Sequence, residues 1–216
     1  MSQGRDASQH ADGPRRGLLV DFGGVLTTDV FASFRTFCEA EGLSPDAVRD
    51  RFREDPAARG LLADLECGRI SEEEFEPRFA ALLGIPDPAA GLIDRLFAGM
   101  QPDQAMLDAV RAARDAGVRT GLISNSWGHG RYDRSQFPQL FDGTVISGEV
   151  GVRKPEPRIY RLGAEAIALP SDQCVFVDDL PGNLKPAREL GMATIHHICA
   201  ERTVPELERA LGVSLR

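Results

Sequence analysis

One short stretch near the start of the chain limits what the protein can fold into. Leu18-Leu19-Val20 is an apolar run that ends in a carboxylate, Asp21, and the glycines Gly23 and Gly24 follow almost at once. Such a run, bounded by turn residues, is typical of a buried parallel strand. Ligand sites in open α/β sheets gather beyond the carboxyl ends of the strands, where Asp21 would lie. We therefore expect a strand with a functional residue at its end, beside glycines that let a ligand approach the backbone.

Strands and helices alternate again from Pro102 onward. Helical patterns end at Gly117 and Gly191, a helix is expected to open at Pro181, and a last helix is expected over 205–211. A loop over 127–130, expected to be mobile, follows the second strand. The predicted strands after the first lie at 118–123, 144–146, 174–177 and 193–195. This alternation predicts the α/β class, with a Rossmann-like parallel sheet and helices on both of its faces.

Between these two parts, from about 29 to 99, apolar residues recur at helical spacing with hardly a strand-like run. Ser71 and Glu74 have the spacing of a capping box, which marks one helix start. We interpret the segment as a helical cap, inserted after the first strand and covering the site as lids do. The predicted organisation is a polar, disordered leader over 1–16, an α/β core over 17–28 and 100–216, and the helical cap over 29–99.

Composition argues against two kinds of partner. The 216 residues carry a formal net charge of −8 without a concentrated Lys/Arg stripe, whereas binding nucleic acid needs clustered cations. The sequence holds no apolar run long enough to span a membrane. The four cysteines form no CxxC pair, so reduced thiols in a cytoplasmic protein fit better than a disulfide framework. The sequence gives no sign of an oligomeric state.

Polar residues follow the predicted strands, where they would meet at one edge of the sheet. Carboxylates at two such positions suit Mg²⁺, which shares its remaining ligand sites with water and phosphate. A hydroxyl and a lysine suit phosphate oxygens, and a free carboxylate can act as a nucleophile that forms an acyl-phosphate. Each residue alone also fits a helix cap, a turn or a solvated loop, but the ordered set favours phosphoryl transfer. The set comprises Asp21, Ser124, Asn125, Lys154, Asp178 and Asp179.

At this level of detail the chain resembles the haloacid dehalogenase (HAD) superfamily, in the subgroup with a helical cap inserted after the first motif. The resemblance extends from Gly17 to about Leu211, and Asn183–Met192 is similar to the amino-terminal phosphatase domain of soluble epoxide hydrolases. Members of the family are mostly Mg²⁺-dependent phosphatases that act through an aspartyl-phosphate. The four family motifs are matched in order by Asp21–Leu26, Leu122–Asn125, Lys154-Pro155 and Val175–Asn183.

The resemblance implies a role for each matching residue around the phosphate. Asp21 would be the nucleophile. Ser124 and Asn125 would hold the transferring phosphoryl group, and Lys154 would tie Asp21 to the phosphate. The implied reaction is hydrolysis of small phosphate monoesters, with a small phosphorylated metabolite as the partner.

The resemblance also implies a Mg²⁺ site. Asp21 and Asp179 would bind the metal directly, and Asp178 would support them. The backbone carbonyl of Gly23 would supply a further oxygen. Asn183 falls where family members often carry a polar group near the metal.

One departure from the family pattern concerns proton transfer. Family phosphatases usually place a second Asp two residues after the nucleophile, as general acid and then base, and this chain has Gly23 there. Such help contributes roughly a hundredfold to ten-thousandfold to the rate. Asp29 and His129 are candidate substitutes, although a solvated loop position explains each of them as well.

Three functions are therefore open. The first is a Mg²⁺-dependent phosphatase, and the second is a degenerate family member that binds a phosphorylated ligand or a protein without turnover. The third is a metal-independent 2-haloacid dehalogenase, against which the Asp178-Asp179 pair counts, since uncompensated anions would repel a substrate carboxylate. A phosphate ester screen separates the first two functions, and Mg²⁺ dependence separates the first from the third.

Overall fold

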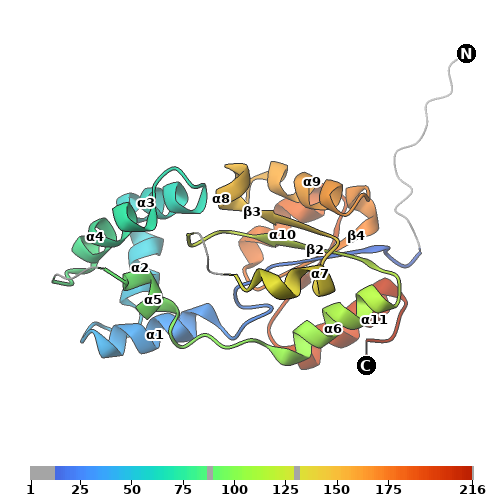
Figure 1. Cartoon of the computed structure of the whole chain (residues 1–216), viewed down its shortest axis with the longest axis horizontal. Helices are drawn as coiled ribbons and strands as arrows, with labels where there is room; N and C mark the ends of the chain where they lie inside the picture. The colour runs from blue at the N-terminus through green and yellow to red at the C-terminus, as the bar shows by residue number, and fades with distance from the viewer. Residues whose placement is uncertain (1–12, 87–89, 129–131, 216) are drawn as a thin grey trace, which may run out of the picture.

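The computed structural model describes residues 13–86, 90–128 and 132–215. Within these residues, five parallel strands form one sheet in the order β3-β2-β1-β4-β5, which confirms the predicted α/β class (Figure 1). The neighbours of β1 are β2 on one side and β4 on the other, so the order of connections reverses at the centre of the sheet. The strands are β1 (Gly17–Val20), β2 (Arg119–Ser124), β3 (Gly143–Ile146), β4 (Cys174–Asp178) and β5 (Ala193–His196).

Alternate side chains of β1 enter two separate hydrophobic cores, as the pleat of a strand requires. Leu18 and Val20 face α6 and α11, whereas Leu19 faces α9 and α10. Helices therefore cover both faces of the sheet (Figure 1). The core helices are α6 (Gln104–Asp115), α7 (Phe137–Leu140), α8 (Ser147–Val150), α9 (Pro157–Ala166), α10 (Pro181–Glu189) and α11 (Ala200–Leu211), with short 3-10 helices η1 (Arg134–Gln136) and η2 (Ser171–Gln173).

The last helix begins earlier than the sequence predicts. Its start was expected at Pro205, because proline favours a first turn, yet α11 begins at Ala200 and contains Pro205. The backbone N–H groups of Arg202 and Thr203 donate to the Cys199 carbonyl, so the first turn forms before the proline is reached. The helix tolerates one missing N–H because its apolar face, including Leu207 and Leu211, is buried against the sheet.

Helices α1 to α5 pack around a hydrophobic core of their own, and together they form what we call the helical unit (Figure 1). Local signals begin several of them. Asp29 caps α1, Asp55 caps α3 just before Pro56, and the predicted Ser71–Glu74 capping box is confirmed at α4. The helices are α1 (Val30–Ala40), α2 (Ala47–Glu54), α3 (Pro56–Glu66), α4 (Glu72–Leu83) and α5 (Leu92–Phe97).

The two chain crossings into the helical unit lie side by side. Thr27 pairs with Pro102 in an isolated antiparallel bridge, and the Thr28 N–H donates to the Gln101 carbonyl at 2.8 Å.

At the other end of the fold, Arg15 and Arg16, which the sequence assigns to the leader, donate backbone hydrogen bonds to the carbonyls of Ala210 and Gln173. None of the described helices is both long and apolar enough to cross a membrane.

Candidate active site

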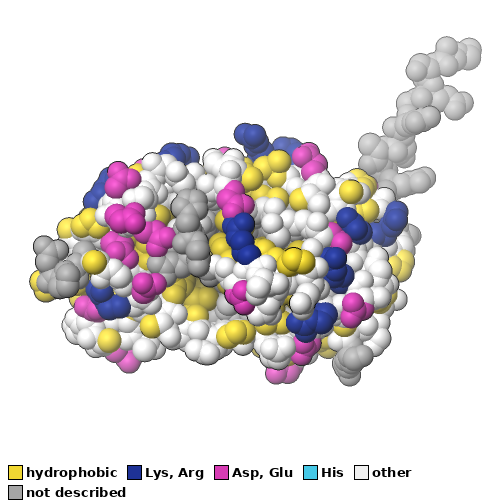
Figure 2. Space-filling view, viewed as in Figure 1, with side chains coloured by type: hydrophobic (Ala, Val, Ile, Leu, Met, Phe, Trp, Pro, Cys, Tyr) yellow, Lys and Arg dark blue, Asp and Glu magenta, His cyan; other side chains and the backbone are white. Residues whose placement is uncertain are grey.

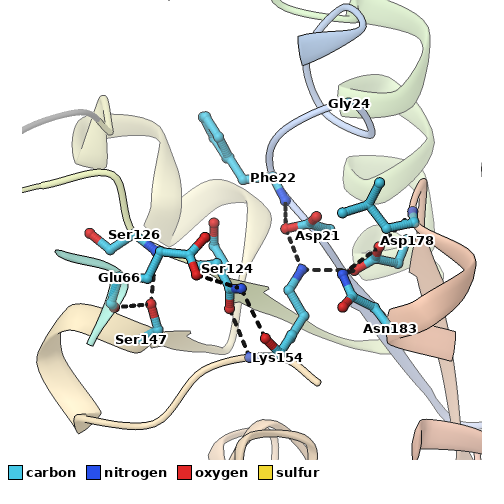
Figure 3. A network of polar contacts seen from close by, with 12 residues as sticks. Asp21, Phe22, Gly24, Glu66, Ser124, Ser126, Ser147, Lys154, Asp178 and Asn183 are labelled. Atoms are coloured by element: carbon cyan, nitrogen blue, oxygen red, sulfur yellow. Dashed lines mark hydrogen bonds and ion pairs between the residues drawn. The ribbon is translucent and has the colours of Figure 1, made fainter. Parts of the chain in front are cut away.

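The strand order places the ends of β1 and β4 next to each other at the centre of the sheet, where the connections reverse. Val20 pairs with Val177, so Asp21, the residue after β1, lies at the same level as Asp178, the last residue of β4. Open α/β sheets form their ligand sites at this point. Lys154, from the loop before α9, lies between the two carboxylates, with its Nζ atom 2.6 Å from Asp21 and 2.7 Å from Asp178 (Figure 3).

Asp178 is fully buried, and its two carboxylate oxygens are occupied. The Leu180 N–H and the Asn183 side-chain amide donate to Oδ1, while Asn183 and Lys154 donate to Oδ2. Burial alone would lower the pKa of Lys154, but Asp178 and Asp21 together raise it. Lys154 is therefore a fixed cation, held in place from the side away from the cavity.

Asp179 differs from its neighbour because it is half-buried and lines the cavity. Oxygen atoms of Asp21, Asp178 and Asp179 lie within 4.8 Å of one another. Burial, followed by the charge of Asp178, raises the pKa of Asp179 to about 6. Burial raises the pKa of Asp21 to about 8, although Lys154 opposes the shift. Three carboxylates lie near one lysine, so a divalent cation bound at the cavity-facing oxygen atoms of Asp21 and Asp179 would balance the charge and fits the site.

Gly24 makes room for this cluster. Its φ of +73° favours glycine, and a Cβ atom there would lie 2.5 Å from the Asp179 Oδ2 atom. Gly23 also faces the cavity, and a Cβ atom there would lie 3.1 Å from Val30 Cγ2. The glycine pair seen in the sequence therefore has two different consequences: Gly24 leaves room for the Asp179 carboxylate, whereas Gly23 places no side chain beside Asp21.

The end of β2 and the residue after it bring the two predicted polar side chains, Ser124 and Asn125, to the cavity. Ser124 is buried, and its hydroxyl lies 2.9 Å from the hydroxyl of Tyr132. The Asn125 side chain holds the main chain of Lys154 in both directions: its Oδ1 accepts from the Lys154 N–H at 2.8 Å, and its Nδ2 donates to the Lys154 carbonyl at 3.2 Å. The structure thus brings Asp21, Ser124, Asn125 and Lys154 to one cleft.

A cavity of about 820 Å³ lies between the core and the helical unit, with Asp21 and Asp179 at its floor. Its walls are largely apolar and include several aromatic side chains, and Figure 2 shows hydrophobic side chains at the surface where the two units meet. Burial raises the pKa of Tyr132 to about 12, so its hydroxyl stays protonated. The aromatic residues in the wall include Phe22, Phe31, Phe34, Phe97, Trp127 and Tyr132.

The sequence offers Asp29 and His129 as candidate substitutes for the missing general acid, and the structure describes the position of Asp29. Asp29 is not among the residues that line the cavity; it caps α1, accepting from the Phe31 N–H, and its side chain is 55% exposed. His129 lies outside the described residues.

Comparison with known proteins identifies the family. The model of the haloacid dehalogenase-like hydrolases matches residues 16–191. The chain belongs to this family. Bifunctional epoxide hydrolase 2 of Sus scrofa is 32% identical over 218 residues, a match that covers 93% of this hydrolase and 39% of the relative. The chain thus spans about two fifths of that relative's length, and the match confirms the resemblance to epoxide hydrolases.

Two further similar proteins carry informative names. The sesquiterpene phosphatase astK of Aspergillus oryzae is 26% identical over 151 residues, which cover 68% of this hydrolase and 77% of the relative. A HAD family enzyme of Bacteroides thetaiotaomicron, solved in complex with magnesium and inorganic phosphate, has the same fold, with a TM-score of 0.65 and 23% identity. The superposition covers 84% of this hydrolase and 93% of that chain.

Several residues of this hydrolase reach the site without having been predicted from the sequence. Trp127 was expected in a mobile loop, but its indole contacts four phenylalanine rings of the helical unit, with centroid distances of 5.1 to 6.0 Å. Glu66 and Asp94 line the cavity from the helical unit, and Arg153 lines it from the core. Arg153 could have been suspected as the neighbour of Lys154. Glu66 gave no signal, because the sequence around it indicates only a helix end.

Proposed function

We propose that this haloacid dehalogenase-like hydrolase is a Mg²⁺-dependent phosphatase of small phosphate monoesters, with Asp21 as its nucleophile. The observation that carries the proposal is Lys154, which is held between Asp21 and the buried Asp178 while Asp179 faces the cavity. The name of the Aspergillus relative and the contents of the Bacteroides structure support phosphatase chemistry and magnesium, respectively.

The chain's own residues would carry the reaction in two steps. An oxygen of Asp21 attacks the phosphorus, the bond to the ester oxygen breaks, and an aspartyl-phosphate forms. Water then attacks the phosphorus, which releases inorganic phosphate and restores the Asp21 carboxylate. Lys154, Ser124 and the backbone N–H groups beside Ser124 would neutralise and orient the phosphoryl oxygens, because positioning and charge do most of the work in phosphoryl transfer.

Asp21, Asp179 and the Gly23 carbonyl would hold the Mg²⁺ ion, which would supply charge neutralisation for the attacking carboxylate and the phosphoryl group. Asp178 would support the site indirectly, because Lys154, Asn183 and the Leu180 N–H already occupy its oxygens. These different roles fit the exposure of the two neighbouring side chains, since Asp178 is buried and Asp179 is half-buried.

The walls of the cavity indicate the kind of ester. Phosphate would bind at the polar floor, and the organic group would contact the aromatic residues above it, including Phe22, Phe31 and Phe97. Apolar area buried by such a group contributes roughly 25 cal/mol per Å². We therefore propose substrates whose organic group is small and largely apolar. The name of the relative from Aspergillus oryzae, a sesquiterpene phosphatase, is consistent with this choice.

One observation favours a second candidate, a protein that binds phosphate esters without turnover. Gly23 provides no side chain for proton transfer, and Asp29 does not line the cavity. The dehalogenase alternative is weaker, because the clustered carboxylates of Asp21, Asp178 and Asp179 would repel the carboxylate of a haloacid unless a cation were present.

A phosphatase assay with and without Mg²⁺ tests the proposal. We expect Mg²⁺-dependent hydrolysis that is much faster for p-nitrophenyl phosphate than for an alkyl phosphate, because a leaving group without an acid must depart as the anion. Asp21→Asn should lose activity towards both esters. Asp29→Asn, which preserves the helix cap, should retain it.

One result would count against the proposal, and a second would count only against the expected absence of a general acid. Binding of phosphate without hydrolysis of any ester would leave the binding protein as the better description. Selective slowing of the alkyl ester by Asp29→Asn would make Asp29 the acid and contradict its role as a helix cap outside the cavity.

A further inference from the structure

Glu66 connects the helical unit to the phosphate-facing part of the core. It is the last residue of α3, its side chain is only 6% exposed, and it lines the same cavity as Asp21. The carboxylate forms an ion pair with Arg153, the residue directly before Lys154. A carboxylate from one unit therefore lies beside the loop that carries the catalytic cation of the other.

The main chain of Glu66 is fixed to the core as well. Its carbonyl accepts a hydrogen bond from the Ser147 hydroxyl, and the oxygen of that hydroxyl accepts from the Ser126 N–H at 2.8 Å (Figure 3). Close packing continues at Gly68, where a Cβ atom would lie 2.6 Å from the Gly148 carbonyl oxygen. The end of α3 thus contacts α8 directly and is linked through the Ser147 hydroxyl to the segment after β2.

The Glu66 side chain also reaches Asn125, whose Nδ2 atom lies 3.4 Å from its Oε2. Asn125 in turn holds the main chain of Lys154 from both sides, and the Nζ atom of Lys154 contacts Asp21. The contacts therefore form a continuous path from the helical unit through Asn125 and Lys154 to the nucleophile. Figure 3 labels Glu66, Lys154 and Asp21, which lie along this path.

Stability alone does not explain a carboxylate at this position. Burial raises the pKa of Glu66 to about 7, and Arg153 is the largest opposing influence, followed by Lys154 and the hydrogen bond from Asn125. A buried ion pair often contributes little net stability, because desolvation offsets the attraction between the charges. Such a pair does fix the geometry of the groups around it, which here are the ones that face the phosphate.

We propose that Glu66 is a positioning residue which, by holding Arg153 and Asn125, makes phosphate binding depend on docking of the helical unit. The inference rests on the proposed function, since it concerns the phosphate that the site would bind. Glu66 acts through its neighbours and takes no part in the bond changes.

Calorimetric binding of inorganic phosphate in the presence of Mg²⁺ tests the proposal on the full chain. Glu66→Ala should weaken phosphate binding about tenfold, a difference of roughly 1.4 kcal/mol. Arg153→Ala should have a similar effect. The double variant should be no worse than either single variant, because both remove the same contact.

Glu76→Ala is the matched control. Glu76 is another buried carboxylate of the helical unit, and the hydrogen bonds that its oxygens accept from described residues come from the Gly91 and Ile93 N–H groups within that unit. It should lower the thermal midpoint at least as much as Glu66→Ala while leaving phosphate affinity within about twofold of the wild type. Glu66→Gln serves if Glu66→Ala does not fold, and it should also weaken binding.

The outcomes separate this inference from the proposed function. Wild-type affinity in the Glu66 variants, or equal weakening by Glu76→Ala, overturns the positioning role and leaves the phosphatase proposal intact. Additive losses in the double variant overturn the path through Arg153. A wild-type protein that neither binds phosphate nor cleaves any ester overturns both.

Discussion

Replacing Lys154 with methionine removes the cation between Asp21 and Asp178 while keeping an unbranched, apolar side chain. Lys154 is 1% exposed, and both of its ion pairs are shorter than 3 Å. Without it, three neighbouring carboxylates would be left with no cation among them. Breaking a buried ion pair from one side costs about 3–5 kcal/mol, because the remaining charge is uncompensated. We expect a loss of that size in the free energy of unfolding at pH 8.

Urea unfolding in the presence of EDTA measures this loss. With a slope of about 2 kcal/mol per M, the midpoint should fall by about 2 M. The loss should shrink as the pH falls. The folded-state pKa of Asp21 is raised, to about 8, so this group favours folding most at low pH, and that contribution is lost as the pH rises from about 4 to 8. Removing Lys154 moves this window upward, because the lysine lowers the pKa of Asp21.

A double variant separates charge from packing. Lys154→Met combined with Asp178→Asn removes one positive and one negative charge, so it should be more stable than Lys154→Met alone. If the free energy of unfolding of Lys154→Met lies within about 0.5 kcal/mol of the wild-type value, the charge argument fails. It also fails if the double variant is less stable than the single one.

Other predictions address the metal, the missing acid and the pH response. Asp179→Ala should abolish Mg²⁺ binding in calorimetry, whereas Asp178→Ala should only weaken it; equal impairment would contradict the assigned roles. Gly23→Asp should raise alkyl phosphate hydrolysis by up to about a hundredfold if Val30 shifts to admit the side chain, and Gly23→Asn should not. The pKa of Glu66 is raised to about 7, so the stability that its protonated form contributes is lost as the pH rises from about 4.5 to 7. Glu66→Gln does not titrate, so the difference between its thermal midpoint and that of the wild type should shift in favour of the variant over the same range.

Local signals in the sequence predict most of the fold and most of the polar residues at the floor of the cavity. Asp21 and Asp178 follow apolar strands, and a parallel sheet brings such strand ends together whatever lies between them. Lys154 is a candidate from its charge and its place before a predicted helix, but its contact with Asp21 is implied only by the resemblance, because a loop residue has no periodicity. The sequence does not single out the short helix α2, since Val48 is its only buried residue and five of its eight residues are charged.

Contacts between the two units could not be predicted at all. The pairing of Glu66 with Arg153 joins residues 87 positions apart in the sequence, and it depends on how the helical unit docks. The position of Trp127 depends on the same docking. Gly128 and its neighbours suggest a mobile loop when only composition is considered, whereas the phenylalanines that surround the indole come from distant helices.

The position of Trp127 provides an optical reporter of the junction. It is the single tryptophan of the chain, so fluorescence excited at the red edge of the indole band comes from this one residue. The ring is carried by the core, three residues after Ser124, yet it lies among Phe34, Phe75 and Phe97 of the helical unit. Any movement that separates the two units would transfer the indole from an apolar to an aqueous environment and shift its emission to longer wavelength. Opening and closing of the cavity can therefore be followed in the unlabelled protein during a single mixing experiment.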